Sequence, residues 1–324
     1  MPKQINQKVQ LIRALSIVGV VLIHTSPKLE WQVFIRPFIN FAVATFVFLS
    51  GYLVNLEIDN PIKFWCKRIN RVLVPYIIWT VVYAFYAFGL NVRAVVAELF
   101  TAQHTWHLYY ILVYVQLVLL TPLLAKLAKS RYMWTGICLG PLWVIVFLYL
   151  PHMGVYHTIP YHELIWHVSC FRWITFYYLG LLLGNGIINK NFSMSRLSWL
   201  YAVAIILYIA EGYYLYCLGV EKCATQSKLS SCLSSCVFIL MAYTYLRNDR
   251  YPQPRQRAIL SLGDYSFGIF FSHVLVILLL RKYSFYNFIP FPINSALVLG
   301  IAWTVVYLTA KVLPKSVSRA MGLR

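Results

Sequence analysis

The chain has 324 residues, of which 60% are hydrophobic and only 11% are charged, and its net charge is +19. A soluble globular protein has about 25% charged residues, so the composition excludes an ordinary soluble protein and indicates a membrane protein. On a soluble chain the basic excess would suggest nucleic-acid binding. Cytoplasmic loops of membrane proteins accumulate Lys and Arg, so we expect the lipid bilayer, and no nucleic acid, as a partner.

Apolar stretches long enough to cross a bilayer recur along the whole chain. They predict an all-α polytopic membrane protein with about ten transmembrane helices, forming a single integral-membrane domain over residues 1–324. In chain order we expect helices near 9–27, 33–55, 72–90, 108–128, 133–150, 170–188, 197–219, 228–246, 262–281 and 293–313.

The distribution of basic residues predicts the orientation of these helices. With the N-terminus inside, nineteen of the 28 Lys and Arg residues fall in inner segments and eight in outer segments, and Arg13 lies within the membrane. Because basic residues accumulate on the inner side, we expect both termini in the cytoplasm. No small-residue cleavage site follows the first apolar segment, so we expect it to remain as a helix and not to be removed as a signal peptide.

Two ionisable residues lie inside the first predicted helix. Arg13 and His24 are eleven positions apart, which returns them to nearly the same helical face, about 16 Å apart along the axis. A buried histidine can simply bond a neighbouring carbonyl, but ionisable groups at membrane depth are costly and usually functional. An imidazole can deprotonate a hydroxyl or attack an acyl group. We therefore predict that His24 and Arg13 are catalytic.

A dense basic cluster precedes the third predicted helix. Lys67 and Arg71 are four residues apart, and Arg68 and Arg71 are three apart, so they share a face at the cytoplasmic mouth of that helix. Such a cluster can anchor to lipid headgroups. A pair of guanidinium groups also suits a phosphorylated ligand through bidentate contacts, and we predict that these three residues bind one.

Two further segments are candidates for lining a polar path. Ser50 and Gly51 lie within the second predicted helix, where small residues either permit close helix packing or leave the Ser50 hydroxyl beside the path. The fourth predicted helix opens with Trp106, His107, Tyr109 and Tyr110. These aromatic residues fit a membrane-interface belt and equally fit a carbohydrate site, because sugars stack on aromatic faces.

Ionisable residues also lie in the later helices. His273 is buried in an apolar run, where it is a candidate for a supporting role, and Asp264, nine residues earlier, is a candidate helix cap. Glu211 is the acid that we place at mid-membrane depth, with Arg13, Arg172 or a histidine as its candidate partners.

Histidines recur every five residues between two predicted helices, at His152, His157, His162 and His167. Zinc sites built on helices favour spacings such as HExxH, and no Cys or acid ligands accompany these histidines, so we expect no metal. Cys217 and Cys223 flank a short loop and could form a disulfide if that loop faces an oxidising compartment.

Several of these motifs together resemble the acyltransferase-3 family of bacterial integral-membrane acetyltransferases, over nearly the whole chain. The residues that carry the resemblance are Arg13 with His24, Phe46-Val-Phe-Leu-Ser-Gly-Tyr-Leu53, Lys67-Arg-Ile-Asn-Arg71 with Pro75, Trp106-His-Leu-Tyr-Tyr110, Phe176-Tyr-Tyr-Leu-Gly180 and Ser266-Phe-Gly-Ile-Phe-Phe-Ser-His273. Each motif is weak alone, and their order and spacing together are specific. Phe267 and Phe270 stand where the family often has tyrosine, which argues against a proton relay at those positions.

The resemblance implies an O-acetyltransferase of the bacterial inner membrane, of the short form without a fused soluble domain. Acetyl-CoA would be the cytoplasmic donor, and the acceptor would be a hydroxyl of a cell-envelope glycan, such as O-antigen or enterobacterial common antigen, presented either free or linked to a lipid. By this analogy Arg13 and His24 match the family's essential pair, and Arg68 and Arg71 match its CoA-side arginines. The alternative is a proton-coupled transporter or glycan flippase that performs no acyl transfer.

Overall fold

The structure is a computed structural model, and it describes residues 3–89, 91–155, 162–248 and 257–323. All the regular elements of this part of the chain are helices. The long ones are α1 (Lys3–Thr25), α3 (Phe41–Tyr52), α4 (Pro61–Phe88), α6 (Tyr109–Ala128), α7 (Thr135–Val144), α10 (Phe171–Gly184), α11 (Met194–Cys217), α12 (Leu229–Arg247), α14 (Ser266–Leu280) and α15 (Ile293–Val312). The short ones are α2 (Leu29–Ile35), η1 (Arg36–Phe38), α5 (Val92–Thr101), η2 (Trp106–Leu108), η3 (Ile145–Tyr149), α8 (Leu150–His152), α9 (His162–Val168), η4 (Glu221–Ala224), α13 (Arg257–Asp264), η6 (Ser284–Phe288) and α16 (Lys315–Ala320).

The prediction of an all-α polytopic membrane protein is confirmed. The described residues contain eight helices, or consecutive helices in one run, that are long and apolar enough to cross a membrane, and nine if α13 and α14, which meet at 79°, form one bent span. The exact number of spans, which we expect to be about ten, stays a prediction. In the predicted range 170–188, α10 has 14 residues and is about 21 Å long, less than the roughly 30 Å of a bilayer core.

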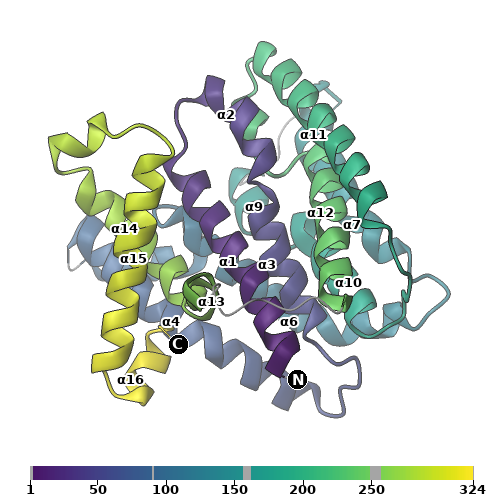
Figure 1. The fold of residues 1–324 in the computed structure, drawn as a ribbon, viewed down its shortest axis with the longest axis horizontal. Helices are drawn as coiled ribbons and strands as arrows, with labels where there is room; N and C mark the ends of the chain where they lie inside the picture. Colours follow the sequence, from purple (N-terminus) through teal and green to yellow (C-terminus); the bar gives the residue numbers. More distant parts are fainter. Residues whose placement is uncertain (1–2, 90, 156–161, 249–256, 324) are drawn as a thin grey trace.

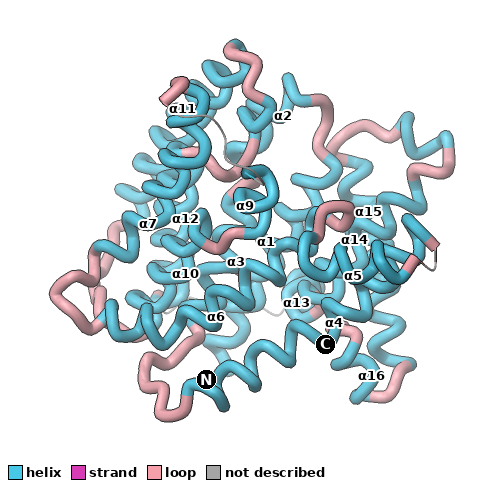
Figure 2. Tube along the Cα trace, turned by 180° about the vertical axis from the view of Figure 1, so that it is seen from behind, coloured by secondary structure: helices cyan, strands magenta, loops and turns pink. Residues whose placement is uncertain are grey.

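The described ends of the chain lie on the same side of the molecule, together with α16 and the start of α4, while α2 and one end of α11 lie on the opposite side (Figures 1 and 2). This agrees with the prediction that both termini share one side. That this side is the cytoplasmic one stays a prediction from the charge distribution. We call it the terminal side, and the side that carries α2 the far side.

Helix α1 lies near the centre of the fold and packs against α3, α13, α14 and α15 (Figure 1). Its first turns are fixed by Lys8, whose buried ammonium group donates hydrogen bonds to the Tyr245 and Leu246 carbonyls at the end of α12 (both 3.3 Å). A cation is favourable at the negative end of a helix dipole. The helix that carries Arg13 and His24 is thereby held in place.

Helices α3 and α10 pack with their backbones almost in contact because glycines face one another. A Cβ atom added at Gly51 would collide with the Tyr177 carbonyl oxygen, and one added at Gly180 would collide with the Phe48 carbonyl oxygen. Small residues permit this approach between membrane helices. The packing explanation for Gly51 is therefore confirmed, and it leaves the neighbouring Ser50 on a different face of α3.

Helix α4 begins eleven residues before the start that we predicted at residue 72. Asn60 accepts a hydrogen bond from the Lys63 backbone N–H (3.0 Å), and Pro61 occupies the first helical position, which together form a strong start signal. The basic cluster therefore lies on the first turns of the helix and not in a loop before it.

Candidate functional site

One large cavity runs through the middle of the described structure. Its volume is about 1670 Å³, well above the roughly 300–1,000 Å³ of pockets that hold one drug-sized ligand. Its polar lining includes, from the terminal side to the far side, Lys63, Lys67, Arg68, Arg71, Arg319, Asp264, Arg13, Ser50, Tyr110, Tyr114, His24, Trp106, His107, Tyr109, His167, Arg172, Arg36, Gln226, Lys222 and Glu163. The cavity is therefore large enough for more than one small ligand.

The terminal-side end of the cavity is lined by five cations, Lys63, Lys67, Arg68, Arg71 and Arg319, and by two acids, Glu57 and Asp59; we call this end the basic mouth. The Arg68 guanidinium donates a hydrogen bond to the Leu53 carbonyl (3.1 Å) just after the end of α3, so part of its role is to cap that helix. Arg71 is exposed and makes no ion pair within the described residues. The structure thus brings the three predicted phosphate-binding residues to one opening.

Arg13 lies further into the cavity, between the basic mouth and His24. It is half-buried, lies within electrostatic range of Arg71, Tyr110 and Asp264, and forms no ion pair with any described residue. Ser50 lines the same part of the cavity, with its hydroxyl donating to the Phe46 carbonyl of its own helix (2.8 Å). The prediction that this hydroxyl lies beside a polar path agrees with that position.

Beyond Arg13, three helices bring three histidines together. The ring centroid of His24 on α1 lies 5.0 Å from that of His273 on α14 and 6.4 Å from that of His107 on η2, and His107 and His273 are 5.4 Å apart. The Trp106 ring lies edge-on to His24 at 4.3 Å. Nδ1 of His24 and both ring nitrogens of His107 are buried without a hydrogen-bond partner. Sequence analysis identified these residues separately, and the fold brings them together. We call His24, His107 and His273 the histidine cluster.

The chain-wide comparison agrees with this geometry. A family model described as an acyltransferase domain matches residues 6–311. The chain belongs to the acyltransferase-3 family. It is thus a membrane acyltransferase of the general kind that this family represents. No curated protein and no solved structure matches the chain.

One hydrogen bond orients His273 of this acyltransferase, and two more, made by Tyr83, hold the helix around it. Its Nδ1 donates to the Ile269 carbonyl one turn earlier (3.0 Å), so Nε2 is directed away from the helix backbone. Tyr83 of α4 places its hydroxyl in the same part of α14, where it donates to the Phe271 carbonyl (2.7 Å) and accepts from the Leu275 N–H (2.9 Å). The Tyr83 ring also contacts His107, at 5.0 Å. Sequence analysis did not identify Tyr83.

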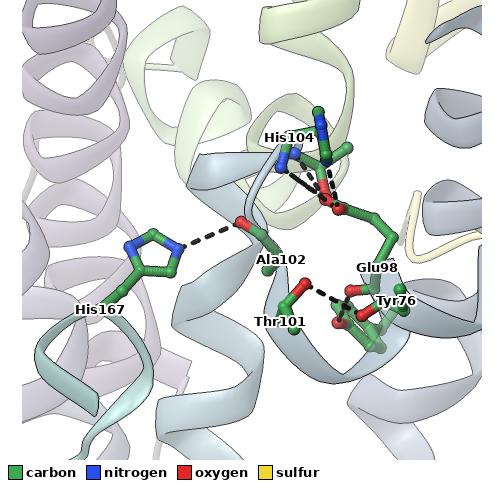
Figure 3. Close-up of polar contacts among 8 residues, drawn as sticks. Tyr76, Glu98, Thr101, Ala102, His104 and His167 are labelled. Atoms are coloured by element: carbon green, nitrogen blue, oxygen red, sulfur yellow. Dashed lines mark hydrogen bonds and ion pairs between the residues drawn. The ribbon is translucent and has the colours of Figure 1, made fainter. Parts of the chain in front are cut away.

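Glu98 fixes the segment that carries Trp106 and His107, and it too was missed. Its buried carboxylate accepts hydrogen bonds from the His104 N–H (3.1 Å), the Thr105 N–H (2.6 Å) and the Thr105 hydroxyl, and contacts the His104 ring (Figure 3). Burial alone would raise the pKa of Glu98, but the hydrogen bonds from Thr105 and His104 outweigh burial and lower it. The only signal in the sequence was an acid within a short apolar helix near Trp106.

Helices α5 and α9 meet beside the histidine cluster. His167 of α9 donates from Nε2 to the Ala102 carbonyl just after α5 (3.1 Å), as Figure 3 shows. Trp166, next to His167, and Trp106, four residues after Ala102, both line the cavity.

Tyr109 and Tyr110 point to different neighbours, because consecutive residues on a helix point about 100° apart. Tyr109 contacts the ring of His167 (5.0 Å), and Tyr110 contacts Phe270 (5.5 Å).

The structure corrects the partners expected for Glu211. Its carboxylate accepts from the backbone N–H (3.0 Å) and the hydroxyl of Ser230 at the start of α12, and it does not line the cavity. It therefore pairs with none of Arg13, Arg172 or a histidine, and it connects α11 to α12 instead.

The remaining histidines and cysteines make local contacts. His152 donates to the Leu148 carbonyl (2.6 Å), His162 contacts the Phe147 carbonyl (3.0 Å), and His157 lies outside the described residues. Among the residues that the structure describes, no three His, Cys, Asp or Glu side chains are placed to hold a metal ion. The disulfide considered for Cys217 and Cys223 does not form, since both are free thiols.

Proposed function

We propose that this acyltransferase transfers an acetyl group from cytoplasmic acetyl-CoA to a hydroxyl of a cell-envelope glycan, in the inner membrane of a bacterium. The observation that carries the proposal is the single cavity that joins the basic mouth to the histidine cluster. A donor with a phosphorylated head and a long flexible arm matches such a cavity. Its head would lie among cations and its reactive end would lie beside an imidazole.

Donor binding is assigned to the basic mouth. Arg71 and Lys67, with Arg68, supply cations for the phosphates of CoA, and among the described residues Arg68 alone of the three also donates a hydrogen bond to a protein carbonyl. Arg13 lies between this mouth and His24, where a fixed cation steadies the donor arm or the developing charge on the thioester oxygen. The same basic residues would also favour the cytoplasmic surface of the membrane.

His24 acts at the thioester by one of two routes. In the first, His24 removes the proton of the glycan hydroxyl, whose oxygen attacks the acetyl carbonyl, and the C–S bond breaks to release CoA. In the second, a ring nitrogen of His24 attacks the carbonyl and CoA leaves as its thiol. The glycan hydroxyl then attacks the acetyl-imidazole, and the C–N bond breaks. His107 and His273 flank His24, with ring centroids 6.4 and 5.0 Å from that of His24, and keep this end of the donor arm among imidazoles.

The test is CoA release by the purified protein in lipid nanodiscs supplied with acetyl-CoA. We expect His24→Ala to abolish release, and Arg71→Gln to raise the KM for acetyl-CoA roughly tenfold by removing a charge-assisted contact. Lys126→Gln is the matched control, because Lys126 is exposed on α6 and does not line the cavity. A burst of CoA without acceptor, equal to the enzyme present, would indicate the acetyl-imidazole route.

A folded wild-type protein that neither binds nor cleaves acetyl-CoA would overturn the proposal. The alternative of a transporter or flippase would then be tested by measuring movement of labelled glycan across the membrane of sealed liposomes that contain the protein. Thioester cleavage separates the two functions because a carrier leaves the donor intact.

A further inference from the structure

The far end of the cavity carries more positive charge than its carboxylates balance. Lys222 is neutralised there by Glu163, with its ammonium nitrogen 2.6 and 2.7 Å from the two carboxylate oxygens. No described carboxylate lies within ion-pair distance of Arg36 or Arg172, which line the same end. Two guanidinium charges therefore face this end of the cavity without a counter-ion among the described residues.

Arg172 is held rigidly by neutral groups. It donates to the His167 carbonyl (2.8 Å) and to the Ser227 hydroxyl (3.4 Å), and its guanidinium carbon lies 4.8 Å from the Tyr109 ring and 5.3 Å from the Trp173 ring. Its Nε is buried with no hydrogen-bond partner. Aromatic faces orient a guanidinium without cancelling its charge. The half-buried Arg172 guanidinium therefore lines the cavity with no carboxylate counter-ion among the described residues, a state that an anionic ligand would stabilise.

Arg36 is also fixed by neutral acceptors. It donates to the Ile23 carbonyl (3.3 Å) and to the Ser26 hydroxyl (3.4 Å), at the end of the helix that carries His24. A cation capping the C-terminal end of α1 is a sufficient structural role for Arg36 by itself. That role does not extend to Arg172, which lies on α10 and has no carboxylate counter-ion among the described residues.

We propose that Arg172, assisted by Arg36, binds an oxyanion group of the acceptor, either a carboxylate or a phosphate. The proposal rests on the proposed function, because it assigns this end of the cavity to the acceptor. Gln226 lines the same end, where its side-chain amide suits a sugar hydroxyl next to the anion. The acceptor class is then an acidic glycan or a glycan that carries phosphate.

The test measures sugar binding by tryptophan fluorescence of the full-length protein in nanodiscs. Glucuronate, glucose 1-phosphate and neutral glucose are the three probes, which distinguish a carboxylate from a phosphate and both from the sugar alone. We expect at least one anionic probe to bind more tightly than glucose, and Arg172→Gln to weaken that binding by roughly tenfold or more. Arg281→Gln is the matched control, since Arg281 is exposed and does not line the cavity.

Preference for glucuronate would identify a carboxylate, and preference for glucose 1-phosphate would identify a phosphate. Arg172→Lys keeps the charge without the planar fork, so it should retain part of the binding, and this variant covers the case in which Arg172→Gln does not fold. Three results would each overturn the proposal. They are binding of glucose as tight as that of both anions, no binding of either anion, and no effect of Arg172→Gln on a folded protein.

CoA release, measured on the same preparations without sugar, reports the proposed function separately. A protein that binds anionic sugars but releases no CoA would refute acetyl transfer and leave the anion site standing. A protein that releases CoA but binds anionic and neutral sugars equally tightly would refute the anion site alone.

Discussion

Replacing Glu98 with Gln tests whether the histidine cluster depends on a carboxylate that does not touch it. Glu98 binds the backbone of His104 and Thr105, which immediately precede Trp106 and His107. Ala102 nearby has a positive φ of 45°, a conformation that non-glycine residues adopt only under constraint. We therefore expect Glu98→Gln to loosen this segment while leaving the basic mouth intact.

The size of the effect follows from the burial of each bond. The Glu98 side chain is 2% exposed, whereas that of His104 is 60% exposed, so the contact with the His104 ring is screened and contributes little. Each of the two bonds from Thr105 is a hydrogen bond to a charged group, worth about 1.5–3 kcal/mol. The Gln amide can keep one of them in neutral form, which leaves a net loss of about 2–4 kcal/mol.

We would measure thermal unfolding and acetyl-CoA turnover of Glu98→Gln in nanodiscs, with Glu30→Gln as the control because Glu30 is an exposed acid on α2. The expected result is a lower unfolding temperature and a lower kcat with an unchanged KM for acetyl-CoA. If both stability and kcat match the control, Glu98 does not position this segment and the reasoning is wrong.

The pH dependence of stability also tests the contribution of the Glu98 carboxylate. The pKa of Glu98 is lowered on folding, so the folded state binds its proton more weakly than the unfolded state does. The stability that ionised Glu98 contributes is complete above the ordinary carboxyl pKa of about 4.3. It is lost as the pH falls through the lowered folded value. The difference in unfolding temperature between wild type and Glu98→Gln should therefore shrink as the pH falls below about 4.

Two further substitutions test the fold and the site. Gly180→Ala places a methyl group against the backbone of α3, with Tyr52 N at 2.7 Å, and should destabilise the protein by about 1–3 kcal/mol. Gly300→Ala, in a helix with open space around the new methyl group, should be neutral or stabilising, and equal unfolding temperatures for the two variants would contradict the packing account. Tyr83→Phe removes a hydroxyl that bonds α14 beside His273, and should cost about 1 kcal/mol of stability and lower kcat more than it changes the KM for acetyl-CoA. An unchanged kcat would show that this hydroxyl does not position His273.

Much of the architecture was predictable because the bilayer imposes a length and an apolar composition on each spanning helix. Most of the predicted ranges correspond to helices. The errors occur where local chemistry overrides hydropathy. Asn60 and Pro61 start α4 well before its apolar portion. The range 262–281 breaks into α13 and α14 at a 79° bend, which places Asp264 on a different helix from His273.

The candidate site was predictable residue by residue but not as an arrangement. Ionisable residues in apolar segments identified Arg13, His24 and His273 because burying them is costly. Nothing in the spacing shows that His24, His107 and His273 meet, since they are separated by more than eighty residues at each step. The same pattern misled us about Glu211, whose partner is Ser230 at the start of the neighbouring helix.

The sequence by itself determined the class of protein, most of its helices and the candidate site residues, because these depend on transfer of individual side chains between water and lipid. Only the tertiary structure decided which of those residues share a cavity, that Glu98 and Tyr83 support the histidine cluster, and that Arg36 and Arg172 lack carboxylate partners among the described residues. Those facts depend on which helices pack together, and close packing is set by side chains far apart in the chain, such as Gly51 and Gly180.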